Sequence, residues 1–206
     1  MSDVLIKAPP LVFPKPGQRA RATMSPGRVN DPGWAARRQA FIDEHGFPPM
    51  EGGAVTATWF GKVFQMIFDD SGKQASLATP IDWNTDTINC ALLNGAGTID
   101  EDTNVDWTDV SATEVSAGGG YTTGGEQLTT PAVTLDTANN RLELDADDAQ
   151  WTSATFSATH AVIYKDSGVD ANSPLLGYVD FGGTETVSSG TFTITWDAEG
   201  ILQIAY

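Results

Sequence analysis

The C-terminal two thirds of the chain alternate between apolar and polar residues in short runs. In Phe192-Thr193-Ile194-Thr195-Trp196 the apolar side chains fall on one face of an extended chain, and the threonines fall on the other. Such runs are typical of β-strands that are buried on one side. They predict strands at residues 87–93, 133–136, 141–145, 155–164, 175–180, 191–196 and 201–206.

Turn residues separate these runs. Asn94-Gly95, Gly118-Gly119-Gly120, Gly182-Gly183 and Ser189-Gly190 are all typical of tight connections between strands. Short strands with no helical period between them indicate a sandwich or barrel. We therefore expect an all-β fold, a single antiparallel β-sandwich of the jelly-roll or immunoglobulin-like kind.

Residues 54–70 follow a different pattern. Trp59, Phe60, Val63, Phe64 and Ile67 recur at helical spacing. This spacing predicts one short amphipathic helix that packs at the N-terminal edge of the sandwich and ends at Asp69-Asp70-Ser71-Gly72.

Residues 1–53 contain most of the eleven prolines, including Pro9-Pro10 and Pro48-Pro49. Proline fixes φ and lacks an amide proton, which favours extended structure over a packed domain. We expect an extended arm here, with one short helix near residues 32–45 that begins at Asp31-Pro32. The acidic domain would then comprise residues 54–206 and fold without the arm.

Charge separates the same two regions. Residues 1–73 carry nine Lys and Arg against seven Asp and Glu, a balance of +2. Residues 74–206 carry two basic residues against twenty acidic ones, a balance of −18, and the two values sum to the net charge of −16. Because nucleic-acid binding depends on Lys and Arg neutralising phosphates, we expect no nucleic-acid partner for the acidic domain.

Catalytic motifs are not evident. The chain has two histidines, and His160 lies inside a predicted strand, where a half-buried structural role is the favoured interpretation. A nucleophile elbow, a zinc-protease motif and a phosphate-binding loop are missing from the sequence. We expect a protein that is not an enzyme and needs no cofactor.

Two weaker binding hypotheses remain. Asp100, Asp102 and Asp106 alternate as Ca²⁺ ligands can, although Val105 and Ser111 stand where an EF-hand loop requires Gly and Glu. Separately, Trp83, Trp107 and Trp151 could stack on sugar rings if they were exposed. The favoured interpretations are a solvated acidic loop and tryptophans at strand edges.

The single cysteine, Cys90, lies in the apolar run Ile88-Asn89-Cys90-Ala91-Leu92-Leu93, which indicates a buried thiol. Prolines interrupt the first residues, so we expect no signal peptide, and no apolar run predicts a membrane span. These features suggest synthesis in a host cytoplasm.

Several motifs in residues 59–206 resemble a widespread family of tailed-bacteriophage virion proteins. They are Trp59-Phe60-Gly61-Lys62, Ile81-Asp82-Trp83-Asn84-Thr85-Asp86, Gly118-Gly119-Gly120-Tyr121, Ala161-Val162-Ile163-Tyr164-Lys165-Asp166-Ser167-Gly168 and Pro174-Leu175-Leu176-Gly177-Tyr178-Val179-Asp180-Phe181-Gly182. The resemblance implies a structural component of a virion and carries no catalytic residues. Residues 1–53 depart from it as an additional arm.

Together these features predict a head decoration, head fibre or connector protein on the outer surface of the particle. Its partners would be the major capsid protein or other virion proteins, and we expect a homo-oligomer. The residues expected to attach the arm to the capsid are Arg19, Arg21, Arg28, Trp34, Arg37, Arg38 and Phe41. The alternative is a receptor- or glycan-binding module of a tail fibre or baseplate, which would use the three tryptophans.

Overall fold

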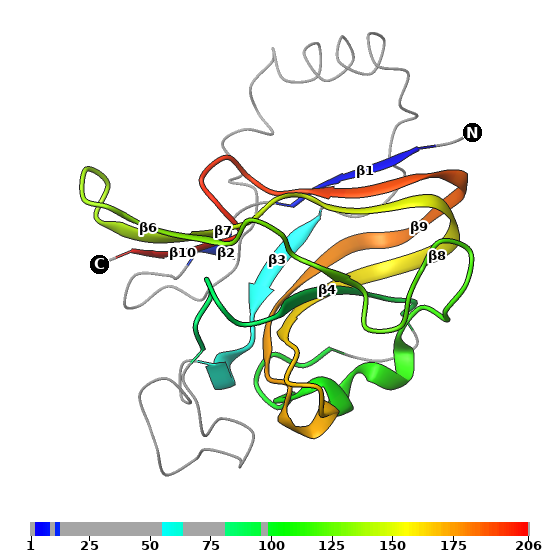
Figure 1. Ribbon diagram of the computed structural model, residues 1–206, viewed down its shortest axis with the longest axis horizontal. Coiled ribbons are helices and arrows are strands. Elements are labelled where there is room, and N and C mark those ends of the chain that lie inside the picture. Colours follow the sequence, from blue (N-terminus) through cyan, green and yellow to red (C-terminus); the bar gives the residue numbers. More distant parts are fainter. Residues whose placement is uncertain (1–2, 9–10, 13–54, 64–80, 96–98, 206) are drawn as a thin grey trace, which may run out of the picture.

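The computed structural model describes residues 3–8, 11–12, 55–63, 81–95 and 99–205, and these residues form two β-sheets (Figure 1). The all-β, sandwich-like fold is confirmed. The strands are β1 Val4–Lys7, β2 Leu11–Val12, β3 Thr56–Trp59, β4 Ile88–Leu93, β5 Glu126–Gln127, β6 Ala132–Asp136, β7 Arg141–Asp145, β8 Ala149–Lys165, β9 Leu175–Thr195 and β10 Leu202–Ala205. The short 3₁₀ helices are η3 Trp107–Asp109, η4 Ser111–Thr113 and η5 Asp170–Asn172.

The larger sheet has the order β1-β9-β8-β4-β5, with β3 also beside β9. β1 pairs with the C-terminal part of β9, and β3 pairs with its N-terminal part. The smaller sheet has the order β2-β10-β7-β6. The sequence predicted purely antiparallel pairing, and this was wrong: β1 pairs with β9 and β2 pairs with β10 in parallel.

The long hairpin of β8 and β9 turns back on itself, so that two halves of one sheet face each other (Figure 1). The pairing register shifts around Ala154, which lies opposite Gly190. Ser153 and Ser189 adopt φ values of 54° and 52°, in the left-handed region. Shifts of this kind increase the local twist and bend a strand, which explains the turn.

The core fills the space between the two halves. Phe192 on the C-terminal part of β9 lies 5.9 Å from Phe181 on the N-terminal part, measured between ring centroids. Trp151 and Phe156 on β8 pack edge to face against each other. Cys90 on β4 is fully buried, as predicted, and burial raises the pKa of its thiol.

The loop at Gly118-Gly119-Gly120 is the expected tight turn, since Gly118 and Tyr121 exchange two backbone hydrogen bonds. It packs directly on the bend of β8: Thr155 N donates to Gly119 O at 2.8 Å. A Cβ at Gly120 would lie 2.7 Å from the carbonyl oxygen of Thr152. Glycine is required because no side chain fits between these two backbones.

Two local predictions were wrong. The strands predicted at 175–180 and 191–196 are parts of one strand, β9, which ends at Thr195, and the predicted turns at Gly182-Gly183 and Ser189-Gly190 lie within it. Residues 56–59, expected to be helical, form β3. Of the helix expected over residues 54–70, the described part contains only a helical turn at 61–63. Thr56-Ala57-Thr58-Trp59 alternates in polarity, and pairing with β9 outweighs the helical spacing of the aromatic residues.

Residues 4–7 and 11–12 lie in the segment expected to be an arm, but they are strands of the two sheets. Ile6 and Ala8 are fully buried, and Ala8 N donates to Thr195 O at 3.0 Å. Val4-Leu5-Ile6-Lys7 can form a strand because no proline interrupts it. The start of the chain is therefore part of the sandwich. The helix expected near 32–45 lies outside the described residues.

The burial of β1 predicts that Ile6→Ala lowers the free energy of unfolding by about 2–5 kcal/mol, because it leaves a cavity in the core. Leu5→Ala on the same strand is the control. Leu5 is 40% exposed, so its truncation should cost about 0.5 kcal/mol or less. Urea denaturation measures both values, and equal losses would contradict the assignment of β1 to the core.

Candidate functional site

The seven residues proposed to attach the arm to a capsid all lie outside the described residues. Their role stays a prediction. They are Arg19, Arg21, Arg28, Trp34, Arg37, Arg38 and Phe41. The other residues singled out in the sequence lie within the described part, and the structure decides what each of them contacts.

The three tryptophans proposed to bind glycans are buried. Trp83, Trp107 and Trp151 expose 4%, 4% and 1% of their surface. Trp83 Nε1 donates to Asp145 O at 2.8 Å, and Trp107 stacks on Tyr164 with 4.4 Å between ring centroids. None of them presents a ring face to a sugar, so their assignment to a glycan site is wrong.

Asp100 and Asp106, two of the three residues proposed as Ca²⁺ ligands, accept hydrogen bonds within their own turns. Asp100 Oδ1 accepts from Asp102 N at 2.9 Å, and such backbone hydrogen bonds lower the pKa of Asp100. Asp106 caps η3 by accepting from Thr108 N at 3.0 Å. No cluster of three or more His, Cys, Asp or Glu suited to a metal occurs among the described residues. The structure therefore offers no support for calcium at Asp100, Asp102 and Asp106.

His160 has neighbours of the types found in hydrolases, but their geometry is structural. Its Nδ1 lies 2.8 Å from Thr159 Oγ1, while its Nε2 is 3.7 Å from Asp180 Oδ1, too far for a hydrogen bond. Thr159 Oγ1 also lies 3.3 Å from Leu93 O, so its single hydroxyl proton can be donated either to this carbonyl or to His160 Nδ1. Without a hydrogen bond from Nε2 to Asp180, the ring lacks the carboxylate that orients a catalytic histidine. Burial lowers the pKa of His160 despite Asp180.

Glu114, between η4 and β5, forms a half-buried polar network. Its Oε1 accepts from Tyr121 Oη at 2.9 Å and from Gly124 N. Tyr121 Oη in turn accepts from Leu92 N at 3.0 Å on β4. Burial raises the pKa of Glu114, and the two hydrogen bonds oppose this shift. The network attaches the loop to the sheet.

Glu114→Gln tests this network. A carboxyl whose pKa is raised in the folded state loses stability as pH rises from its unfolded value through the folded pKa. The glutamine stays neutral, and its Oε1 can still accept both hydrogen bonds. The variant should therefore gain stability relative to the wild type as pH rises from about 4.5. Urea denaturation at successive pH values measures this, and a constant difference would contradict it.

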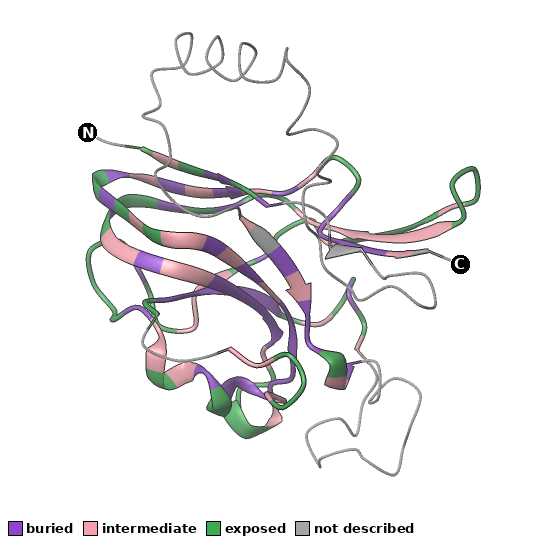
Figure 2. Ribbon diagram, turned by 180° about the vertical axis from the view of Figure 1, so that it is seen from behind, coloured by how far each residue is buried: buried purple, intermediate pink, exposed green. Residues whose placement is uncertain are grey.

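The smaller sheet projects from the sandwich (Figures 1 and 2). The pairing register shows that its two faces differ chemically. Residues paired across strands share a face. Val133 pairs with Leu144, and Leu135 pairs with Leu142, which also pairs with Ile204 of β10. One face is therefore aliphatic. Val133 and Leu135 expose 40% and 58% of their surface.

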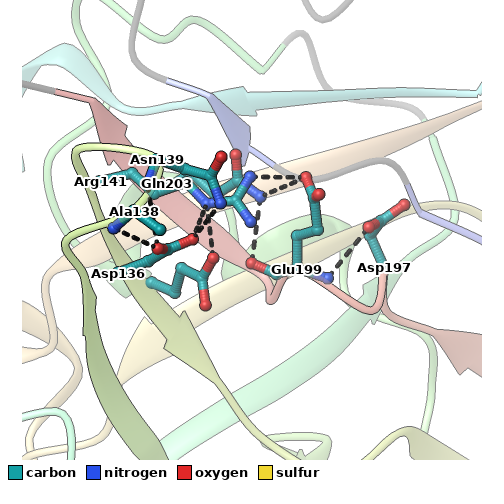
Figure 3. Close-up of polar contacts among 8 residues, drawn as sticks. Asp136, Ala138, Asn139, Arg141, Asp197, Glu199 and Gln203 are labelled. Atoms are coloured by element: carbon teal, nitrogen blue, oxygen red, sulfur yellow. Dashed lines mark hydrogen bonds and ion pairs between the residues drawn. The ribbon is translucent and has the colours of Figure 1, made fainter.

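Arg141 organises the opposite face (Figure 3). Its guanidinium contacts Asp136 at 3.2 Å, Glu143 at 2.6 Å and Glu199 at 2.8 Å. Asp136 also accepts from Ala138 N and Asn139 N in the turn between β6 and β7. Gln203 Nε2 donates to Glu199 O at 3.1 Å. Arg141 thus links the hairpin turn to the loop before β10, and Gln203 of β10 binds the same loop.

These contacts explain why the pKa values of Asp136 and Glu199 are lowered. Hydrogen bonds from Asn139 are the largest cause of the lowered pKa of Asp136, and Arg141 adds to it. The hydrogen bond from Arg141 is the largest cause of the lowered pKa of Glu199. Arg141 and the carboxylates of Asp136 and Glu199 bind one another, so the polar face stabilises the β6–β7 hairpin. The exposed aliphatic face and the outer strand β6 are the part suited to binding.

The alternation in Ala132-Val133-Thr134-Leu135-Asp136 was a sufficient signal for a strand with one apolar face. The alternation could not reveal that Val133 and Leu135 stay exposed, because that depends on which other elements pack nearby within the described residues. This surface was therefore missed as a candidate site in the sequence. The aliphatic surface of Val133 and Leu135 contains no titratable side chain, unlike the proposed Ca²⁺ site.

Arg141→Gln should lower the melting temperature at neutral pH, because it leaves Asp136, Glu143 and Glu199 without their cation. The pKa values of Asp136 and Glu199 are lowered in the folded protein. Such carboxyls provide stability above the unfolded pKa, and this stability is lost as pH falls through the folded pKa. The difference from the wild type should therefore shrink below about pH 4. Thermal unfolding at several pH values measures it. An unchanged difference at about pH 2.5 would indicate lost packing of the arginine stem instead.

A scan against protein-family models and searches of curated proteins and of solved structures gave no match to this chain. Within the described residues, helices with the length and hydropathy needed to cross a membrane were not found. A functional proposal therefore rests on the charge and motifs of the sequence and on the contacts within the described residues.

Proposed function

We propose that the protein is a non-enzymatic structural component of a tailed-phage virion. It would lie on the outer surface as a head decoration, head fibre or connector protein and be held there by the basic segment near its N-terminus. Its partners would be the major capsid protein or other virion proteins. The observation that carries the proposal is the separation of charge, with +2 in residues 1–73 and −18 in residues 74–206.

The charge separation favours an external position. A body with a charge of −18 is repelled by packaged DNA, whose phosphates would instead attract Lys and Arg. Five arginines lie between residues 19 and 38, where they can pair with acidic groups on a shell. The resemblance of residues 59–206 to tailed-phage virion proteins favours the same kind of particle.

The fold adds a constraint on how such a segment would attach. The chain leaves the smaller sheet at Val12 of β2 and re-enters the described structure at Val55, just before β3. Residues 13–54 are therefore joined to the sandwich at both ends. An attachment segment in this position would transmit force to two strands rather than one.

The non-enzymatic part of the proposal is supported by the contacts of the reactive groups. His160 Nε2 is 3.7 Å from Asp180, too far for a hydrogen bond, Glu114 holds a loop on β4 through Tyr121, and the Cys90 thiol is buried. Each of these groups has a structural role. The receptor-binding alternative loses the tryptophans that were its candidate residues.

The test uses particles that lack this protein and purified full-length chain added back to them. Replacing Arg19, Arg21, Arg28, Arg37 and Arg38 by Gln should reduce binding at least about tenfold, because each arginine lost removes a charge contact with the shell. Binding of the wild type should also weaken as salt rises. Lys7→Gln, which neutralises an exposed cation on β1, is the control and should bind normally.

Immunogold labelling of intact virions with antibody against the purified protein places it in the particle. Label on the head, neck or tail of unopened particles is the expected result. Label that appears only after the capsid is opened would overturn the external position. Wild-type binding by the five-arginine variant would overturn the role of the basic segment.

A further inference from the structure

β6 is the outer strand of the smaller sheet, and its outer edge is unpaired within the described residues. On its inner side it pairs with β7 over all five residues. On its outer side no strand pairs with it within the described part of the chain. By contrast, β4 is covered on its outer side by β5 and by Val115 N, which donates to Leu92 O at 2.8 Å.

The composition of β6 does not discourage pairing. Exposed edge strands usually carry lysine, proline or a bulge that prevents another strand from adding to them. β6 has none of these: its residues Ala132 to Leu135 are uncharged and exposed, and its pairing with β7 has no register shift. The aliphatic side chains of Val133 and Leu135 lie on one face, beside those of Leu142 and Leu144.

We propose that β6 pairs antiparallel with β6 of a second copy of this chain, so that two smaller sheets join into one continuous sheet. In an isologous pair, the same strand contacts itself across a two-fold axis. With Thr134 on that axis, Val133 lies opposite the partner's Leu135, and Ala132 lies opposite the partner's Asp136.

This register is selected by two requirements. Residues opposite each other in an antiparallel pair must lie on the same face of the sheet. Aliphatic residues of the two β6 strands therefore meet only if the two-fold axis passes through a residue and not between two residues. Of the axes that meet this requirement, the one through Thr134 pairs the whole length of β6. The aliphatic face then continues across the join without a gap.

Charge agrees with the register. Asp136 is the one charged residue of β6, and with the axis at Thr134 it faces the partner's Ala132 and not a second carboxylate. Its own carboxylate is already held by Arg141 at 3.2 Å and by Asn139. An axis through Asp136 would instead bring two carboxylates opposite each other, which is unfavourable.

The association should be weak for the isolated chain. Stable interfaces bury more than about 1,000 Å², and one strand pair with four aliphatic side chains buries less. The two bodies also repel each other, because residues 74–206 carry −18 each. Salt screens this repulsion and should strengthen the pair. A basic strand from another protein would show the opposite salt dependence.

The experiment traps the pair with cysteine in the full-length protein. Residues opposed across an antiparallel pair have Cβ atoms about 4.5–5.5 Å apart, close enough for a disulfide after a small adjustment. Thr134→Cys should form covalent dimers in oxidised glutathione at least about tenfold faster than Val169→Cys, with the rate read from non-reducing gels. Val169 is 54% exposed and lies beside η5, far from β6 in the sequence, and buried Cys90 cannot compete.

Two further experiments test the register of the strand pair and the role of the aliphatic face in association. A mixture of Val133→Cys and Leu135→Cys proteins should cross-link faster than either protein alone, since these residues oppose each other. Adding Leu135→Asp to Thr134→Cys should reduce the rate to that of Val169→Cys, because it brings charge into the aliphatic face. Leu135 is 58% exposed, so this change should leave the fold intact, as circular dichroism can verify.

Cross-linking of Thr134→Cys no faster than that of Val169→Cys, in both low and high salt, would overturn the proposal. So would equal rates for the mixture and the single proteins. Should Thr134→Cys fail to fold, the mixture alone decides the question. These measurements use the purified chain, so their outcome does not depend on the proposed place in a virion.

Discussion

The bend in the β8–β9 hairpin is the constraint on which the rest of the fold depends. Two strands of 17 and 21 residues are too long for a small sandwich unless they turn back on themselves. The shifts in register around Ala154 and the positive φ angles of Ser153 and Ser189 produce that turn. Each strand thereby contributes to both halves of the core, and aromatic residues from both halves meet at Phe181 and Phe192.

Other elements attach to this bent hairpin. β1 and β3 share one edge of it, β4 lies along the other, and the Gly118-Gly119-Gly120 turn packs on the bend itself. This contact satisfies both elements. The glycines allow the turn to approach the backbone of β8 closely, and the turn supplies a hydrogen-bond acceptor for an amide group at the bend. That amide is Thr155 N, which donates to Gly119 O. The loop from η3 to β5 is therefore part of the core structure.

The large negative charge is accommodated by local use of carboxylates. Asp100 and Asp106 bind backbone amides of their own turns, and Asp136 holds the β6–β7 turn. Such hydrogen bonds stabilise the ionised form of the carboxylates. Arg141 serves three carboxylates at once, so the few cations of the body carry much of the compensation.

The sequence by itself determined the fold class, most strand positions and the burial of Cys90, because alternation of polarity and turn residues are local properties. Local patterns could not show that residues 175–195 form one bent strand, that 56–59 leave a helical pattern to pair with β9, or that residues 4–7 enter the core. Those outcomes depend on partners far away in the chain. The same reason decided the candidate sites: a tryptophan or a strand edge has the same sequence whether it is covered or exposed, and only tertiary packing buried Trp107 and left Leu135 in contact with solvent.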